Sequence, residues 1–254
     1  KRASETGLSC IAICDHDCVD GIKPAISAAS QYGIEVIPGI ELTAERHGRE
    51  VHILGYFIDI EDKAFLKKLM EIRQIRVERI YKMVDKLKGA GLSLDPEKVF
   101  KLSGDGSVGR LHLAHALYKE GLISSVNEAF KWYIGDTGPC YVKGFKLKPE
   151  EAVETILKVG GIPVMAHPYT MGGDKLLLEL IKVGLRGVEA YHPDNHKGIR
   201  KHFVEIAEEF GLVVTGGSDC HGAGKERILM GTVMVPYDIV ERLKEEKARM
   251  GPRD

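Results

Sequence analysis

The unit that decides the fold is clearest in residues 208–221, which read EEFGLVVTGGSDCH. This stretch contains the end of an amphipathic helix, a glycine (Gly211), a short apolar strand and a turn that carries Asp219 and His221. Glycine is favoured after a helix because it adopts the left-handed C-cap conformation without steric cost. The same order of helix, glycine and strand recurs at Gly33, Gly160 and Gly184. Repeated units of this kind predict an α/β fold with a parallel sheet.

Short apolar stretches are the predicted strands, and amphipathic stretches between them are the predicted helices. The strands are expected at Leu8–Ile13, Ile34–Ile37, Val51–Ile58, Ile162–Ala166, Gly187–Tyr191 and Leu212–Thr215. The helices are expected at Ile22–Tyr32, Pro149–Val159, Leu176–Val183 and His196–Phe210. So many βα units in one chain favour a barrel over an open doubly wound sheet. No GxGxxG or P-loop pattern follows a strand, so a dinucleotide or P-loop site is not indicated.

The middle of the chain differs, because residues 61–148 are mostly helical in pattern. Helices are expected at Phe65–Lys88, Pro96–Leu102, Arg110–Glu120 and Val126–Tyr133. The chain is therefore expected to divide into a first barrel part (1–60), an all-α insertion (61–148) and a second barrel part (149–254). The insertion either covers a site at the strand ends or only stabilises one flank of the barrel. Trp132 is expected in the core of the insertion, with stacking on a nucleobase as the alternative.

Composition excludes several classes of protein. The 254 residues include 36 Lys and Arg against 37 Asp and Glu, and this balance does not indicate duplex DNA binding or an acidic membrane surface. No apolar run approaches the roughly 20 residues that cross a bilayer. The 5 cysteines are an odd number without framework spacing, which favours a reducing cytoplasm over a disulfide scaffold.

Histidines and carboxylates gather at the predicted strand ends. The residues are Asp15, His16, Asp17, Glu41, His52, His167, His192, Asp219 and His221. Segments that follow parallel barrel strands converge on one face, so these side chains are expected to meet. Imidazole and carboxylate are ligands of Zn, Mn, Fe or Ni, and clustered ions promote phosphoester hydrolysis. The pattern predicts metal-assisted hydrolysis.

These stretches resemble, in order, the successive motifs of the polymerase and histidinol phosphatase (PHP) superfamily. The matching stretches are Cys14–Asp17, Gly39–Glu41, Val51–Tyr56, Ala166–Pro168 and Ser218–Gly222. Gly109–His112 and Val188–Pro193 resemble the stand-alone phosphoesterase branch in particular. The resemblance covers nearly the whole chain. It implies a distorted (β/α)7 TIM-like barrel with an all-α insertion, and two or three divalent ions, which are Mn, Fe or Zn. It also implies hydrolysis of nucleotide 3′,5′-bisphosphates or of the 5′ ends of short RNA.

The resemblance also implies a role for each matching residue. Glu41 would bridge two ions, His52 and His167 would complete the second, Asp219 would belong to the first, and His16 and His221 would hold a third. Glu41, Asp219 and His221 are thus the expected catalytic residues, and an ion-activated hydroxide would attack phosphorus. Arg110 and His112 are expected to bind substrate phosphate, an arginine fork suiting that group, and His192 is a further candidate. Arg227 is another candidate for a phosphate contact.

Departures from the family pattern leave alternatives open. The family opens with a His-x-His strand end and a nearby Asp, and we expect that segment upstream of Lys1; otherwise the first ion has few ligands. Cys14 stands where the family has Thr. A non-catalytic metal-binding module is the alternative function. A histidinol phosphatase is a second alternative, against which the Gly109–His112 stretch argues. His47 is expected in a solvated hairpin.

Overall fold

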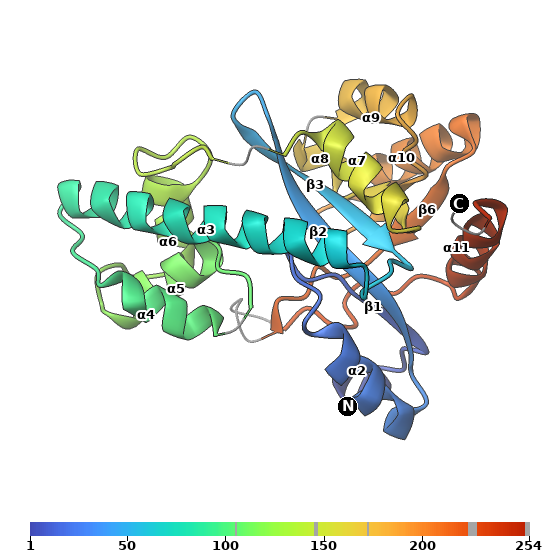
Figure 1. Ribbon diagram of the computed structural model, residues 1–254, viewed down its shortest axis with the longest axis horizontal. Helices are drawn as coiled ribbons and strands as arrows, with labels where there is room; N and C mark the ends of the chain where they lie inside the picture. Colours follow the sequence, from blue (N-terminus) through green and yellow to red (C-terminus); the bar gives the residue numbers. More distant parts are fainter. Residues whose placement is uncertain (105, 145–146, 172, 223–227, 252–254) are drawn as a thin grey trace.

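The computed structural model describes residues 1–104, 106–144, 147–171, 173–222 and 228–251. Its centre is a curled, six-stranded mixed sheet in which each strand pairs with the next along the chain (Figure 1). The strands are β1 (Cys10–Ile13), β2 (Glu35–Arg46), β3 (Arg49–Tyr56), β4 (Ile162–Met165), β5 (Gly187–Tyr191) and β6 (Val213–Gly216). Every predicted strand is present, which confirms the α/β class. The sheet forms half of a barrel.

The predicted parallel sheet is wrong at one strand, because β3 runs antiparallel to both β2 and β4. The other three neighbouring pairs are parallel. The reversal occurs at a two-residue turn of His47 (φ 52°) and Gly48 (φ 77°), the positive-φ pair that tight hairpins require. His47 is exposed at this turn, so the predicted solvated hairpin is confirmed.

The second strand is much longer than the predicted Ile34–Ile37, because Pro38 and Gly39 do not end it. A Cβ at position 39 would lie 2.6 Å from the Cys14 sulfur and 2.9 Å from the carbonyl oxygen of Ile13. Gly39 therefore permits the close approach of β1 and β2 inside the sheet rather than a turn. The longer strand carries Glu41 into the middle of the sheet.

Helices pack on the sheet as the alternating pattern predicts. They are α2 (Ile22–Ala29) with the 3-10 turn η1 (Ser30–Tyr32), α7 (Pro149–Lys158), α9 (Gly173–Ile181) and α10 (Lys197–Phe210). Gly33 and Gly211 adopt the left-handed conformation behind their helices, with φ of 63° and 66°. Three helices were not predicted, namely α1 (Arg2–Glu5), α8 (Pro168–Met171) and α11 (Asp238–Arg249). The first two are single turns, too short for a periodic signal, whereas α11 packs Ile239, Val240 and Leu243 against the sheet.

The helical middle of the chain has its own hydrophobic core. It comprises α3 (Lys63–Gly89), α4 (Pro96–Ser103), α5 (Arg110–Lys119), α6 (Val126–Ala129) and the π-helix η2 (Phe130–Ile134). Helix α3 joins the two parts, since Leu69 packs in the core of the sheet and Met83 in the core of the helical segment (Figure 1). Trp132 is 59% exposed, so the prediction that it lies in this core is wrong. Within the described ranges, no helix is both long and apolar enough to cross a membrane.

Candidate metal centre

The carboxylate of Glu41 lies at the centre of a group of histidines. Its Oε1 is 2.8 Å from Nδ1 of His52 and 3.4 Å from Nε2 of His167, and its Oε2 is 3.8 Å from Nδ1 of His16. Glu41 and His52 come from β2 and β3, His16 from the turn after β1, and His167 from the turn after β4. Ligand atoms of His16, Glu41 and His52 all lie within 4.8 Å of one another, close enough for one ion.

A second group lies beside the first. Asp219 Oδ2 is 3.8 Å from Nε2 of His192, and Asp219 Oδ1 is 3.5 Å from Nδ1 of His221. The His167 and His192 rings are 5.4 Å apart, and those of His16 and His221 are 6.2 Å apart. The two groups are therefore continuous, and the structure brings together the six residues that the sequence nominates as ligands, with His192 beside them.

Histidine protons compensate buried negative charge in this centre. Burial opposes ionisation of Glu41, but His16, His52 and His167 outweigh it and hold the pKa of Glu41 well below its usual value. Burial also opposes protonation of His52, yet Glu41 and Glu50 raise the pKa of His52 to about 10. Burial lowers the pKa of His16 to about 4. The centre thus pairs an ionised carboxylate with a cationic ring, and a divalent ion is suited to replace that ring's proton.

Backbone strain also marks the site. The φ angles of Asp17, His167 and Asp219 are 50°, 26° and 45°, in the left-handed region that non-glycine residues seldom adopt. Such residues cost about 1–3 kcal/mol each and cluster at functional sites, where neighbouring groups hold them. The His167 N–H donates to Glu189 Oε2 at 3.0 Å, and this hydrogen bond stabilises the strained turn after β4.

Two buried acids beside the centre were not predicted from the sequence. Burial raises the pKa of Glu189 to about 8, since it lies on β5 at 6% exposure close to Glu41 and Asp219. Glu50 lies on β3 at 8% exposure. For Glu189, the signal in the sequence is an acid inside the apolar stretch Gly187–Tyr191. For Glu50, it is the spacing of two residues from His52, which places both side chains on one face of the strand.

Asp17 is fully buried, and it ties the site to α3. Its Oδ2 accepts from Nε and Nη2 of Arg76 at 2.7 and 2.6 Å, and its Oδ1 accepts from the Thr43 N–H at 2.9 Å. Arg76 Nη2 also donates to the Thr43 hydroxyl at 2.6 Å, and that hydroxyl lies 3.5 Å from Nδ1 of His16. Asp17 is therefore a structural anchor behind His16 rather than a plain turn residue.

The expected phosphate ligands have different surroundings. Arg110 donates from Nη2 to Glu50 at 2.9 Å and from Nη1 to Asp136 at 2.7 Å, so acceptors of the protein occupy much of its guanidinium. His112 accepts from the Gly109 N–H through Nδ1 at 3.1 Å, which caps α5. Burial lowers the pKa of His112, and the positive charges of His115, Arg76 and His221 lower it further. Arg227 lies outside the described residues.

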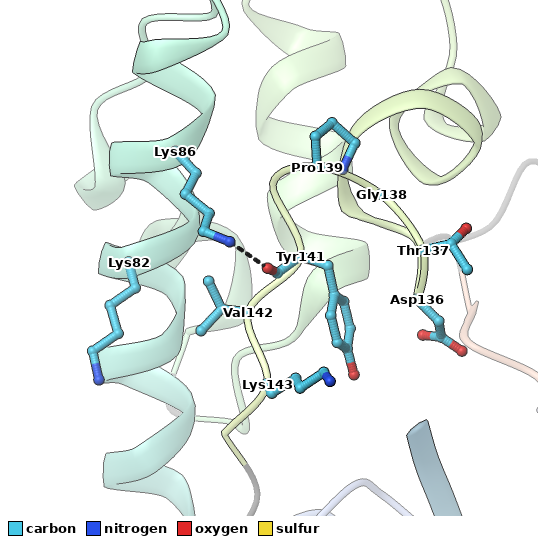
Figure 2. A pocket seen from close by; sticks show the side chains of 9 residues that line it. All are labelled: Lys82, Lys86, Asp136, Thr137, Gly138, Pro139, Tyr141, Val142 and Lys143. Atoms are coloured by element: carbon cyan, nitrogen blue, oxygen red, sulfur yellow. Dashed lines mark hydrogen bonds between the residues drawn. The ribbon is translucent and has the colours of Figure 1, made fainter. Parts of the chain in front are cut away.

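An open groove lies at the outer end of these Arg110 contacts (Figure 2). Lys82, Lys86, Asp136, Tyr141 and Lys143 are among its lining residues. Lys86 Nζ donates to the carbonyl oxygen of Tyr141 at 2.8 Å, which fixes the loop along the groove to α3. None of the metal-centre histidines lines this groove, so it is separate from the candidate site.

The donor set fits divalent metal ions. Several imidazoles converge on two carboxylates, the ligand types that Zn, Mn and Fe accept. Nε2 of His192 is buried and has no hydrogen-bond partner within the described part of the chain, which leaves a nitrogen lone pair or N–H next to Asp219 for another group. The arrangement brings these donors together where the turns after β1 and β4 meet β2 and β3.

Comparison with known proteins gives consistent matches, although no family model matches the chain. A 5′-3′ exoribonuclease of Haemophilus influenzae is 35% identical over 227 residues, 87% of this chain and 82% of that protein. A 3′,5′-nucleoside bisphosphate phosphatase of Chromobacterium violaceum is 30% identical over 230 residues, 88% of this chain and 81% of that protein. A crystal structure from Bifidobacterium adolescentis, assigned as a metal-dependent phosphoesterase, superposes with a TM-score of 0.86 at 27% identity, covering 99% of this chain and 89% of that one.

Proposed function

Because this chain belongs to the polymerase and histidinol phosphatase (PHP) family of metal-dependent phosphoesterases, we propose that it hydrolyses nucleotide 3′,5′-bisphosphates or the 5′ ends of short RNA. Metal-dependent hydrolysis of a small phosphorylated substrate follows from the family. The substrate class is the proposal, and it is supported by the substrates in the names of the relatives. The observation in the structure that carries the proposed metal-dependent reaction is the convergence of His16, His52 and His167 on the Glu41 carboxylate.

We assign the ligands as follows. Glu41 would bridge two ions, His52 and His167 would complete the second, and Asp219 would belong to the first. His16 and His221 would hold a third ion, so the site would take two or three ions of Mn, Fe or Zn. Such ions lower the pKa of a coordinated water and offset the negative charge of the phosphoryl oxygens.

The side chains of the protein prepare the site for this reaction. Glu41, Asp219 and His221 are the proposed catalytic residues, and no side-chain nucleophile is required. His52 would bind an ion through Nδ1, the nitrogen that faces Glu41, and its ring would then be neutral. His112 and His192 are the proposed phosphate contacts, because both are partly or fully buried beside His221 and Asp219. A phosphate contact by Arg110 gains no support from its geometry, since Glu50 and Asp136 already hold its guanidinium.

The curled sheet supports the proposal of a distorted (β/α)7 barrel, of which the described strands are the larger part. The separate core of the helical segment supports the division into barrel parts 1–60 and 149–254 with an insertion at 61–148. We also place the protein in the cytoplasm, on the basis of its odd number of cysteines without framework spacing.

The test is a substrate panel with purified protein and added Mn²⁺. We expect phosphate release from adenosine 3′,5′-bisphosphate or nucleotide release from a 5′-phosphorylated RNA oligomer, and no phosphate release from histidinol phosphate. Glu41→Gln should abolish this activity, whereas Glu150→Gln, which alters an ion pair with Arg46 away from the centre, should retain it. Activity on histidinol phosphate alone would refute the proposed substrate class.

A further inference from the structure

A buried carboxylate lies behind the metal centre, on the side of His52 that faces away from Glu41. Oε2 of Glu50 is 3.6 Å from Nε2 of His52. Glu50 belongs to β3, as does His52, and it is 8% exposed. A buried carboxylate needs partners that compensate its charge, and Arg79 and Arg110 supply them for Glu50. It therefore has a defined place in the site although the proposed reaction does not use it.

The two nitrogens of His52 face different groups. Nδ1 faces the centre, 2.8 Å from Oε1 of Glu41 and 3.4 Å from Nε2 of His167. Nε2 faces Glu50. A neutral imidazole that binds an ion through Nδ1 carries its proton on Nε2. A carboxylate that accepts this N–H fixes both the tautomer and the ring orientation, and it makes the ligand nitrogen more basic.

We propose that Glu50 is a positioning residue that holds His52 in the tautomer and orientation needed to bind a metal ion, and that Arg79 and Arg110 of the helical segment hold Glu50. This inference rests on the proposed metal site. It extends that site by one layer into the helical segment, so that the segment takes part in metal binding through contacts behind the ligands.

Two arginines from different helices fix the position of Glu50. Arg79 of α3 places Nη2 at 2.6 Å from Oε1, and Arg110 of α5 places Nη2 at 2.9 Å from Oε2. Both guanidinium groups lie against the ring of Tyr141, at 5.1 and 5.2 Å from its centroid. The carboxylate therefore has a guanidinium beside each oxygen, with a hydrogen bond from Arg110 to Oε2, and it keeps its charge after burial.

Each arginine is in turn fixed by the helical segment. Arg79 Nε donates to the carbonyl oxygen of Val142 at 2.7 Å, and Arg110 Nη1 donates to the carbonyl oxygen of Ile134 at 3.2 Å and to Asp136. Asp136 and Tyr141 line the groove in Figure 2, at the outer end of this chain of contacts. A continuous set of ion pairs thus runs from the groove to His52.

This assignment gives Arg110 a different role from that of a phosphate ligand. Replacing a residue that binds substrate phosphate changes KM and leaves the affinity for metal ions intact. Replacing a residue that positions Glu50 changes the affinity for metal ions even when no substrate is present. Metal affinity, measured without turnover, therefore separates the two roles.

The experiment compares Glu50→Gln with the parent protein and with Glu150→Gln. Mn²⁺ binding is measured by isothermal titration calorimetry without substrate. We expect the Kd of the tightest site to rise about 10- to 100-fold in Glu50→Gln, as for other residues behind metal ligands, and to stay unchanged in Glu150→Gln. In Zn²⁺-loaded protein labelled with ¹⁵N-histidine, we expect the Nε2 proton resonance of His52 to move upfield in Glu50→Gln only, since its charged acceptor is gone.

A second variant covers the case in which Glu50→Gln does not fold. Glu50→Asp keeps a negative charge for Arg79 and Arg110 but withdraws it from His52, and we expect the same loss of affinity. In Arg110→Lys we expect weaker Mn²⁺ binding. A raised KM with unchanged Mn²⁺ binding would make Arg110 a substrate ligand and refute its role in positioning Glu50. An unchanged Kd and His52 resonance in both Glu50 variants would overturn the inference.

The same measurements separate this inference from the proposed function. A parent protein that binds Mn²⁺ but cleaves no phosphoester refutes the proposed function. The effect of the Glu50 variants on Mn²⁺ affinity can still be measured in that case, so the inference is tested separately. A parent protein that binds no Mn²⁺ overturns both.

Discussion

Replacing Asp17 by Asn should destabilise the protein strongly, although Asp17 is not a proposed metal ligand. The carboxylate is 0% exposed and accepts three hydrogen bonds, two from Arg76 and one from the Thr43 N–H. Removing one partner of a buried ion pair costs about 3–5 kcal/mol, because the other charge remains buried without compensation. Arg76 keeps its hydrogen bonds to Val108 and Thr43, so we expect the lower end, about 3 kcal/mol.

Urea and thermal unfolding, followed by circular dichroism, measure this loss. In a protein of this size each kcal/mol lowers Tm by about 2–4 °C, so Asp17→Asn should lower Tm by about 6–12 °C. The double variant Asp17→Asn/Arg76→Met should be less destabilised than the sum of the single variants, because the buried cation is also removed. The exposed pair Lys23–Glu61 is the control, and Glu61→Gln should change the unfolding free energy little. A loss for Asp17→Asn as small as that for Glu61→Gln would refute the reasoning.

Three further predictions concern the centre and the sheet. Glu41→Gln should reduce phosphoesterase activity at least about 100-fold, since it removes the charge proposed to bridge two ions. His47→Ala at the exposed hairpin should leave the activity unchanged, and equal effects of the two substitutions would contradict the bridging role. Burial raises the pKa of Glu189 to about 8 in the folded state, so its contribution to stability is present below about pH 4.5 and is lost as pH rises to 8. Urea unfolding in EDTA should therefore show a shallower decline from pH 5 to 8 for Glu189→Gln than for the parent, and an identical decline would disprove this assignment. Gly39→Ala should destabilise the protein by about 1–3 kcal/mol in the same unfolding assay, because its Cβ would meet backbone oxygens at 2.9 and 3.1 Å. Gly89→Ala is the control: a Cβ there would have no atom within 4 Å, so this variant should be neutral or slightly stabilising.

The elements with periodic signals could be predicted from the sequence. Residues 208–221 indicated a helix, a left-handed glycine and a strand, and the structure has α10, Gly211 and β6 there. The repeated βα units predict a parallel β3 because strand periodicity does not encode direction, whereas the hairpin expected at His47 agrees with the antiparallel pairing of β2 and β3. The full length of β2 was missed because Pro38 and Gly39 commonly end strands.

The candidate site was predictable to the extent that its residues follow strands. His16 and His167 follow β1 and β4, where polar residues after strands converge, whereas Glu41 lies inside β2. The contacts behind them were not predictable, since Glu50 and Arg79 are ordinary charged residues in sequence and become partners only when α3 packs beside β3. The exposure of Trp132 was missed for the same reason, because which face of a short helix is covered depends on tertiary packing.

The central claim is that strand-end histidines and carboxylates bind a cluster of metal ions. Elemental analysis of the purified chain, compared with Glu41→Gln, tests it most directly. We predict about two to three ions of Mn, Fe or Zn per chain, with most of them lost in Glu41→Gln. A parent chain without bound metal after reconstitution, or the same metal content in Glu41→Gln, would contradict the claim.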